Sequence, residues 1–380
     1  MLMKKRTVMT IVGTRPELIK LSRIIPELDR SFRHILVHTG QNHDYELNGI
    51  FFDQMGIRKP DHFLDAARPT AAGSIAEIIL RSDAIFEKEK PDALLIYGDT
   101  NSCLSVIPAK RRHIPIFHLE AGNRCFDERV PEEVNRRIID HVSDVNMPLT
   151  EHGRRYLLAE GIRPETIFKV GSCMREVIEH HRKGVERSAI LKELKLAVGK
   201  YVVASFHREE NVDDPSNLRA ILDSLDAVKR EFGKRIIVST HPRTRKRLDA
   251  LKHKMSKDIL FIKPLGFLDY IRLQKDAFCV LSDSGTLTEE AAILGFPAVM
   301  IRNAHERPEG MDTGVAMMSG LHADRVLAAV EMVTRMPWVP VTVPDYEQAQ
   351  VSITVVRIIA SYIDYVNRTV WQNRLPKHSA

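Results

Sequence analysis

Short apolar runs rich in β-branched residues alternate along this chain with longer amphipathic stretches, and this alternation is the strongest constraint on its fold. Strands that alternate with helices form parallel sheets covered by helices on both faces. Two such series therefore predict an α/β protein with two doubly wound, Rossmann-like domains. The predicted strands are Thr7–Val12, His34–His38, Ala93–Tyr97, Ile114–His118, Val145–Met147 and Ile167–Val170, followed by Tyr201–Phe206, Ile236–Ser239, Leu260–Ile262, Phe278–Ser282 and Ala298–Ile301.

The segment between the two series marks a domain boundary. Residues 171–200 have a charged, helical pattern, and a second strand series begins directly after them. We therefore predict an N-terminal domain over residues 1–171 and a C-terminal domain over residues 172–357. The last helical stretch has no strand after it, so we expect its residues 358–380 to complete the first domain.

Composition and hydropathy narrow the class of protein. Of the 380 residues, 44% are hydrophobic, which is enough for two domain cores. No apolar run approaches the roughly 18 residues that a membrane span needs. The basic N-terminus and the apolar stretch Thr7–Val12 resemble a signal peptide, but the stretch is too short. We therefore expect a cytoplasmic protein that does not associate with membranes.

Cysteine spacing and charge weigh against two further classes. The four cysteines, Cys103, Cys125, Cys173 and Cys279, form no CxxC pair, so neither a zinc site nor a disulfide framework is predicted. Reduced thiols are the expected state. The formal charge of +6 is dispersed along the chain, which favours a solvated surface over a nucleic-acid partner. An anionic small substrate also suits this charge.

Polar residues follow several of the predicted strands at the point where each strand ends. In doubly wound sheets, ligands bind beyond the carboxyl ends of the strands. The pattern therefore predicts a cleft lined by polar loops from both domains. The loops are Gly13-Thr14-Arg15, Gly98-Asp99-Thr100, Glu120-Ala121-Gly122, His207-Arg208-Glu209-Glu210 and Asp283-Ser284-Gly285-Thr286.

The segment Ser284-Gly285-Thr286 is a candidate phosphate site because it precedes a predicted helix. A glycine lets a ligand approach the backbone, and free amides at a helix start hold phosphate. The same residues also fit an ordinary N-cap with Glu289 or Glu290 as the capping-box partner. Three cations are candidates for phosphate binding: Arg15, Lys20 and Arg307. The alternative is that they are surface charges or helix caps. No P-loop or dinucleotide fingerprint is present.

Three carboxylates and one histidine are candidates for proton transfer. Asp99 and Glu120 end predicted strands, and Glu132 begins a helix that contains Arg136. A single carboxylate at such a position is usually structural, but three at one cleft supply acids and bases with separable pKa values. His207 ends a strand of the second domain, either as a hydrogen-bonding residue or as a catalytic group.

These segments, taken in order, resemble the motifs of the non-hydrolysing UDP-N-acetylglucosamine 2-epimerases. Each match is weak, but the ordered set from about residue 7 to 310 is specific. The matching segments are Gly13-Thr14-Arg15-Pro16-Glu17 with Ile19-Lys20, Gly98-Asp99-Thr100, His118-Leu119-Glu120-Ala121-Gly122, Pro131 to Arg136, His207 to Asn211, Asp283-Ser284-Gly285, Glu289-Glu290-Ala291 and Arg302 to Glu309.

The resemblance implies a glycosyltransferase-B-like fold that binds UDP mainly in the C-terminal domain and the sugar in the interdomain cleft. It implies elimination of UDP to a glycal and re-addition with inversion at C2, without a metal or redox cofactor. Asp99, Glu120 and Glu132 would be the acid–base groups. The residues implied to stabilise the diphosphate or bind the substrate are Arg15, Lys20, Arg136, His207, Ser284, Gly285, Thr286 and Arg307, with Glu290 on the ribose and Pro264 and Phe267 against uracil. We also expect a homodimer.

Two departures from the general family pattern and a closer likeness to one subgroup set this sequence apart. Thr286 replaces the second glycine after Ser284, and Gln41-Asn42-His43-Asp44-Tyr45 lacks the arginine of the Gln-His-Arg activator segment. The stretches Tyr97 to Leu104, Pro108 to Arg112 and Gly122 to Asp127 resemble the capsule and O-antigen enzymes that make UDP-N-acetyl-L-fucosamine from UDP-2-acetamido-2,6-dideoxy-L-talose. Asn123 stands where the general epimerase often has leucine.

Other functions remain open at this stage. A UDP-N-acetylglucosamine/UDP-N-acetylmannosamine epimerase fits the same motifs, and a glycosyltransferase of this fold would use the same UDP site with an acceptor. A hydrolysing epimerase commonly carries a fused kinase, for which 380 residues leave no room. A nucleic-acid-binding protein lacks support, because basic and aromatic residues do not interleave.

Overall fold

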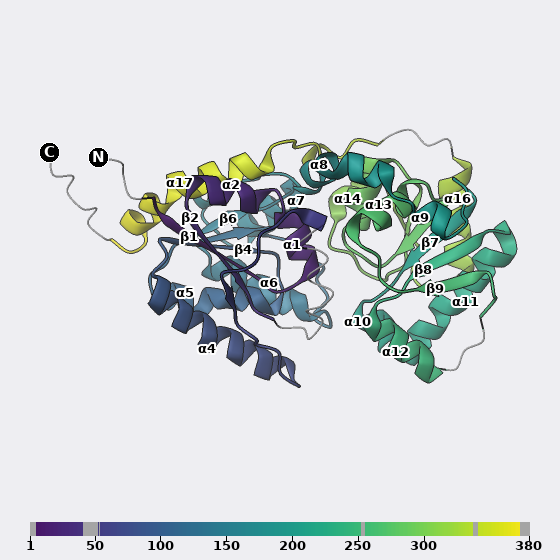
Figure 1. The fold of residues 1–380 in the computed structure, drawn as a ribbon, viewed down its shortest axis with the longest axis horizontal. Helices are drawn as coiled ribbons and strands as arrows, with labels where there is room; N and C mark the ends of the chain where they lie inside the picture. The colour runs from purple at the N-terminus through teal and green to yellow at the C-terminus, as the bar shows by residue number, and fades with distance from the viewer. Residues whose placement is uncertain (1–4, 41–51, 53, 252–254, 337–340, 373–380) are drawn as a thin grey trace. The chain divides into compact units, whose positions relative to one another are not determined.

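The protein was analysed as a computed structural model that describes residues 5–40, 52, 54–251, 255–336 and 341–372 (Figure 1). The chain forms two compact units. One comprises the residues up to Val177 together with those from Gln348, and the other comprises Ile178–Glu347. Within the described ranges, no helix combines the length and apolarity needed to cross a membrane.

The first unit is built on a six-stranded parallel sheet in the order β3-β2-β1-β4-β5-β6. All residues of β1 and β4 are buried, as expected for strands covered on both faces. The C-terminal helix α17 (Val351–Thr369) belongs to this unit and packs against α2 (Figure 1). The strands are β1 Thr7–Val12, β2 Arg33–His38, β3 His62–Phe63, β4 Ala93–Tyr97, β5 Ile116–Leu119 and β6 Val145–Met147; the helices are α1 Arg15–Leu21, α2 Ile24–Ser31, α4 Ala71–Glu89, η1 Asn101–Ser105, α5 Val106–Arg111, α6 Pro131–Val142, α7 Glu151–Ala159 and η2 Pro164–Thr166.

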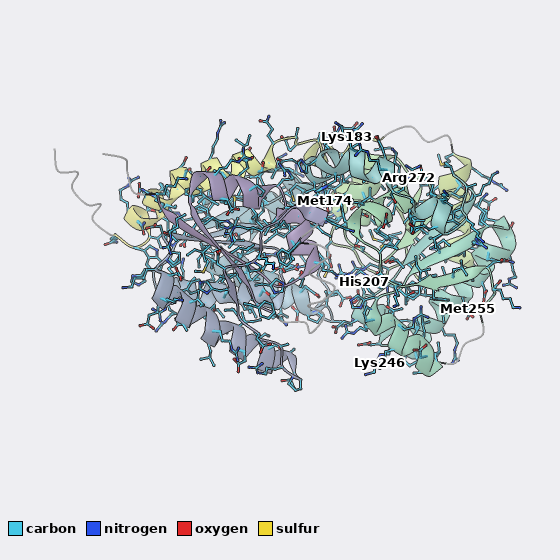
Figure 2. The ribbon with its side chains drawn as sticks, viewed as in Figure 1. Met174, Lys183, His207, Lys246, Met255 and Arg272 are labelled. Atoms are coloured by element: carbon cyan, nitrogen blue, oxygen red, sulfur yellow. The ribbon has the colours of Figure 1, made fainter. Side chains whose placement is uncertain are left out.

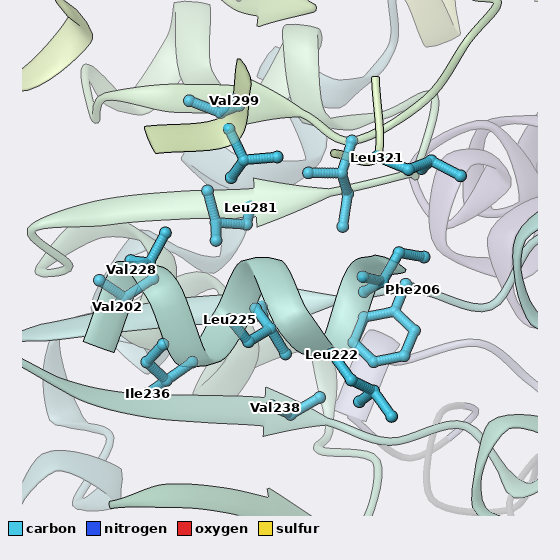
Figure 3. Close-up of a cluster of buried hydrophobic side chains, with 14 of the residues drawn as sticks. Val202, Phe206, Leu222, Leu225, Val228, Ile236, Val238, Leu281, Val299 and Leu321 are labelled. Atoms are coloured by element: carbon cyan, nitrogen blue, oxygen red, sulfur yellow. The ribbon is translucent and has the colours of Figure 1, made fainter. Parts of the chain in front are cut away.

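The second unit has its own six-stranded parallel sheet in the order β12-β11-β10-β7-β8-β9. Figure 3 shows how Leu222, Leu225 and Val228 of α11 pack on this sheet. The strands are β7 Tyr201–Ser205, β8 Arg235–Ser239, β9 Ile259–Ile262, β10 Cys279–Ser282, β11 Ala298–Met300 and β12 Met317–Met318; the helices are α8 Met174–Arg187, which begins in the first unit, α9 Ile190–Glu193, α10 Glu209–Val212, α11 Pro215–Phe232, α12 Pro242–Leu251, α13 Phe267–Lys275, α14 Leu287–Leu294, α15 Pro308–Asp312, α16 Ala323–Arg335 and η3 Pro344–Tyr346.

Both sheets have the same topology, and this topology determines where ligands bind. In each unit the strand order reverses between the first and the fourth strand, at β1/β4 and at β7/β10. Ligands of doubly wound sheets bind outside the carboxyl ends of the strands at such a switch point. The two-domain α/β prediction is therefore confirmed, and it directs attention to the loops after β1, β4, β7 and β10.

The prediction of a strand over Ile167–Val170 was wrong. Ile167 forms only an isolated parallel bridge with Asn146, while the amides of Phe168 and Val170 donate to the carbonyls of Asn146 and Pro148 at 2.9 and 3.0 Å. The segment runs along β6 without completing a ladder. The two-residue strands β3 and β12 were not predicted, because so short a run carries no alternation.

Candidate functional site

The loop after β1 is held by Glu17, the third residue of α1. The Glu17 carboxylate accepts hydrogen bonds from the amides of Gly13 and Thr14 at 2.8 and 2.6 Å and from the Thr14 hydroxyl at 2.8 Å. This is a capping box. A Cβ atom on Gly13 would lie 1.9 Å from the Ser102 Oγ, so only glycine fits there.

Glu17 also joins the two loops at the switch point. Its second oxygen accepts a hydrogen bond of 2.9 Å from Thr100 in the loop after β4. Burial raises the pKa of Glu17, and the hydrogen bonds from Gly13, Thr14 and Thr100 oppose that shift. Glu17 lies in the first family-like motif but was not among the predicted site residues. The Thr14-to-Glu17 capping-box spacing was the signal that identifies it.

Asp99 follows β4 and forms an ion pair with the predicted substrate-binding residue Arg136. Arg136 Nη2 lies 2.7 Å from Asp99 Oδ2, and Arg136 Nη1 lies 3.2 Å from Glu133 Oε2. Arg136 is buried, whereas the Asp99 side chain keeps partial solvent access. Asn135 donates a 3.0 Å hydrogen bond to the Asp99 carbonyl. The first turns of α6 therefore hold the Asp99 loop in place.

Glu120 follows β5 and lies beside the Asp99 loop. Lys20 Nζ is 3.0 Å from Glu120 Oε1, and both side chains are nearly buried. The backbone at Glu120 has φ = 72°, a left-handed conformation that is uncommon for a residue with a side chain. A Cβ atom on Gly98 would lie 3.4 Å from Glu120 Oε2. The structure thus brings Lys20, which we predicted for phosphate or substrate, to a candidate catalytic carboxylate.

Two further predicted residues lie on helices that begin at this edge of the sheet. Glu132 is the second residue of α6 and is half-buried. Arg15 is the first residue of α1 and is also half-buried. The helix predicted to begin at Glu132 begins one residue earlier, at Pro131. The first unit therefore gathers Arg15, Lys20, Asp99, Glu120, Glu132 and Arg136 on the loops and helix starts after β1, β4 and β5.

Asp283 organises the switch point of the second unit. This fully buried carboxylate follows β10 and accepts hydrogen bonds of 3.0 Å from the amides of His207 and Arg208 and from the Asn211 side chain. The His207 ring is 43% exposed, with Nδ1 3.3 Å from Asp283 Oδ1. Figure 2 labels His207 close to α10. Asp283 thus presents the histidine at the edge of its sheet.

The segment Ser284-Gly285-Thr286 leads into α14. The hydroxyls of Ser284 and Thr286 lie 3.0 Å apart. Thr286 is the N-cap residue, but its side chain makes no capping hydrogen bond, so the capping-box alternative is not realised. A Cβ atom on Gly285 would lie 3.4 Å from Glu306 Oε2 and 3.7 Å from Arg208 Nη2. The glycine therefore lies beside the ion pair of Arg208 and Glu306, whose atoms are 3.1 Å apart.

The remaining predicted residues lie on neighbouring elements of the second unit. Glu290 accepts a 2.7 Å hydrogen bond from Gln274. Arg307 is buried as the N-cap residue of α15, and its Nη2 lies 3.6 Å from Glu289 Oε2. Phe267 starts α13 and is buried, with its ring edge-on to His181, while Pro264 is half-buried in the preceding loop. The segment Gln41–Tyr45, which lacks the arginine of the family's activator segment, lies outside the described residues.

Comparison with known proteins identifies a single family. The model of the family described as UDP-N-acetylglucosamine 2-epimerase matches residues 26–360. The structure of UDP-N-acetylglucosamine 2-epimerase from Rickettsia bellii is 54% identical, covers 97% of this chain and 100% of its own, and superposes with a TM-score of 0.90. The Methanocaldococcus jannaschii UDP-GlcNAc 2-epimerase in complex with UDP-GlcNAc and UDP is 32% identical over 93% of this chain and 99% of its own, with a TM-score of 0.88.

A relative with a different named substrate is similar over most of the chain. The UDP-2,3-diacetamido-2,3-dideoxy-D-glucuronate 2-epimerase of Pseudomonas aeruginosa is 34% identical over 325 residues, which is 84% of this chain and 90% of that protein. Proteins similar to this chain thus carry names with more than one UDP-amino sugar.

Proposed function

The chain belongs to the UDP-N-acetylglucosamine 2-epimerase family, and we propose that it inverts C2 of a UDP-linked N-acetylamino sugar by eliminating and re-adding UDP. The enzyme is an isomerase of the non-hydrolysing type. The observation that carries the mechanistic proposal is the pair of carboxylates Asp99 and Glu120, which follow the neighbouring strands β4 and β5 at the same edge of the sheet. Each of them lies within 3.0 Å of a buried cation.

The chemistry explains why carboxylates and a leaving diphosphate are needed together. The hydrogen at C2 of an amino sugar has no adjacent ring carbonyl to acidify it. When the C1–O bond to UDP breaks, positive charge develops at C1, and a base then removes the C2 proton to form the C1–C2 double bond of a glycal. Re-addition reverses these steps: an acid protonates C2 on the opposite face, and a UDP oxygen bonds to C1. No bond to water forms, so re-addition gives a product that is again linked to UDP.

We assign the two groups of residues to the two ends of the ligand. Asp99, Glu120 and Glu132 serve as acid and base at C2, with Arg136 and Lys20 balancing the charges of Asp99 and Glu120. In the second unit, His207 and Arg307 stabilise the departing diphosphate together with the backbone of Ser284, Gly285 and Thr286. Arg15 adds a cation from α1. Glu290 binds the ribose, and Pro264 and Phe267 lie against uracil.

Isotope exchange tests the elimination. In heavy water and without any acceptor, the wild-type enzyme should give a product with deuterium at C2, because the removed proton exchanges with solvent before the opposite face is protonated. Traces of free UDP and glycal should accompany it. Proton NMR and mass spectrometry of the product measure both. A product that keeps its original C2 hydrogen would contradict the mechanism, and turnover only with an added acceptor would favour a glycosyltransferase.

We further propose that the substrate is UDP-2-acetamido-2,6-dideoxy-L-talose, which the enzyme converts to UDP-N-acetyl-L-fucosamine for capsule or O-antigen synthesis. The support is Asn123, in a stretch similar to that subgroup. Its side-chain amide donates a 3.4 Å hydrogen bond to Glu120 Oε1. A polar side chain at a carboxylate that acts on C2 is well placed to influence which sugar configuration is accepted. The alternative is UDP-N-acetylglucosamine, the substrate in the name of the Rickettsia bellii protein.

A substrate panel tests this choice. We expect kcat/KM for the 6-deoxy L-talo or L-fuco sugar to exceed that for UDP-N-acetylglucosamine. A pocket for the 6-methyl group rejects a hydroxyl by only about a hundredfold. The opposite ring configuration is a stronger filter, because it leaves buried polar groups unpaired. Both sugars, together with the diacetamido glucuronate, are compared without activator by NMR. An equal or higher value for UDP-N-acetylglucosamine would remove the subgroup assignment and leave the family unchanged.

We also propose that the enzyme works as a homodimer in the cytoplasm, without nucleic-acid or membrane partners. The support is the family resemblance of the whole chain. Sedimentation equilibrium of the purified protein measures the assembly.

A further inference from the structure

A buried ionic network lies directly beneath the two candidate catalytic loops of the first unit. Its centre is Asp140 on α6, which is fully buried. The Asp140 carboxylate accepts hydrogen bonds from the Gly122 amide, 3.2 Å from each oxygen, and from Arg124 Nη1 at 2.7 Å. Gly122 lies two residues after Glu120. Asp140 thus holds the backbone of the Glu120 loop.

His118 extends this network to the other loop. Its Nδ1 lies 2.9 Å from Asp140 Oδ1, and its Nε2 forms a 2.8 Å hydrogen bond with the carbonyl of Gly98. Because a carbonyl only accepts, Nε2 carries the hydrogen in this contact. Gly98 precedes Asp99. One carboxylate therefore contacts the Glu120 loop directly and reaches the Asp99 loop through one imidazole.

Each of the two loops that this network contacts turns at a glycine. Gly98 and Gly122 have φ values of 73° and 79°, which favour glycine. A Cβ atom on Gly122 would lie 2.3 Å from the Gly153 carbonyl oxygen. The backbone at Gly122 is therefore closely packed against α7, two residues after Glu120.

Contacts with His118 and Arg124 favour the ionised form of Asp140. Arg124 is buried and donates two hydrogen bonds, of 2.8 and 2.6 Å, to the carboxylate of Glu160. Burial by itself would raise the pKa of Asp140, but the contacts from His118 and Arg124 outweigh it and lower that pKa. The carboxylates of Asp140 and Glu160 are thus joined by hydrogen bonds from the Arg124 guanidinium, and the His118 ring lies against Asp140 at an ion-pair distance.

We infer that Asp140 is a positioning residue of the epimerase, holding the Asp99 and Glu120 loops at the separation that proton transfer at C2 requires. The inference rests on the proposed function. Asp140 does not touch the substrate. It acts through the Gly122 amide and through His118. Catalysis depends steeply on the placement of reacting groups, so that a shift of about 1 Å can cost on the order of a hundredfold in rate.

The chain offers a matched control for this inference. Asp144 follows α6 and is also buried; it accepts a 2.9 Å hydrogen bond from the Ile116 amide and pairs with Lys110 at 2.5 Å. Ile116 is the first residue of β5, so Asp144 lies at the amino end of the strand whose carboxyl end carries Glu120. Asp140→Asn and Asp144→Asn each remove one buried charge of the same unit, near opposite ends of β5.

The experiment compares kcat, KM, UDP affinity and thermal stability of the two variants with the preferred UDP-sugar. We expect Asp140→Asn to lower kcat by about tenfold to a hundredfold while KM and UDP affinity change little. Asp144→Asn should lose stability but keep kcat. Equal kcat values in the two folded variants would overturn the inference. A wild-type protein that epimerises no UDP-sugar would instead refute the proposed function.

Two variants of His118 test the same link if Asp140→Asn does not fold. The amide of His118→Gln retains a donor for the Gly98 carbonyl, whereas His118→Phe has none. We expect the phenylalanine variant to lose more kcat than the glutamine variant at similar UDP affinity. If both variants turn over alike, Asp140 does not act on the Asp99 loop through His118, and the inference fails.

Discussion

Replacing Glu120 with glutamine should lower kcat by at least about a hundredfold, the usual contribution of a general acid or base. The amide keeps the size of the side chain but cannot take up a proton. Asp99→Asn and Glu132→Gln are expected to show losses of the same order. Turnover is followed by NMR of the UDP-sugar under saturating conditions, and UDP affinity is measured by calorimetry. UDP affinity should change far less than kcat, because these residues belong to the first unit and act on the sugar.

The backbone conformation at Glu120 is a separate reason to test this residue. A left-handed conformation of a residue with a side chain costs of order 1–3 kcal/mol and persists where the surrounding structure imposes it, often at functional sites. Here Lys20 Nζ lies 3.0 Å from the Glu120 carboxylate, and both side chains are nearly buried.

Glu128→Gln is the control for the carboxylate series. Glu128 lies between Glu120 and Glu132 in the chain, is largely exposed and pairs with Arg137 at 2.9 Å. Its replacement should leave kcat unchanged. Wild-type turnover in all three variants of Asp99, Glu120 and Glu132 would remove the proposed catalytic set.

Replacing Asp283 with alanine should cost about 3 kcal/mol of folding free energy, since each buried donor left without an acceptor costs about 1–3 kcal/mol. The amides of His207 and Arg208 and the side chain of Asn211 all lose their acceptor. The same change should weaken UDP binding, because the His207 loop is no longer held against β10. Denaturant unfolding measures the stability, and calorimetry at low temperature measures UDP affinity of the folded fraction.

Asp214→Ala provides the comparison within the same unit. Asp214 is the exposed N-cap of α11 and accepts hydrogen bonds from the amides of Ser216 and Asn217. Water replaces those contacts, so we expect a smaller loss of stability and no change in UDP affinity. If Asp283→Ala retains normal UDP affinity, the β7/β10 switch point does not bind the nucleotide in the way proposed here.

The fold was largely predictable because it depends on local patterns. Strands β1, β4 and β6 have the predicted bounds, since a buried parallel strand is a continuous apolar run between turn residues. The candidate loops could be predicted for the same reason, because the polar residues that end such runs can be recognised from the sequence alone. The segment Ile167–Val170 was wrongly predicted as a strand, because an apolar run alone does not show whether a neighbouring strand completes the ladder.

The partners of the site residues were less predictable. Glu17 and Asp140 are charged residues on amphipathic helices, and such residues usually face solvent. The structure buries both: Glu17 accepts hydrogen bonds from two backbone amides, and Asp140 accepts from the Gly122 amide and from Arg124. Only the contact of Glu17 with Thr14 could be predicted from the sequence, because the two residues are three positions apart and have the spacing of a capping box.

The sequence by itself determined the two parallel sheets and the identity of the polar residues at their carboxyl ends, because hydrophobic periodicity and strand termination are local properties. Only the tertiary structure decided which of these residues act together. Lys20 is one hundred residues from Glu120, and Asp283 is seventy-six from His207, yet each pair is in contact. Such pairing follows from strand order, since β4 is inserted beside β1 and β10 beside β7. No spacing along the chain encodes that order.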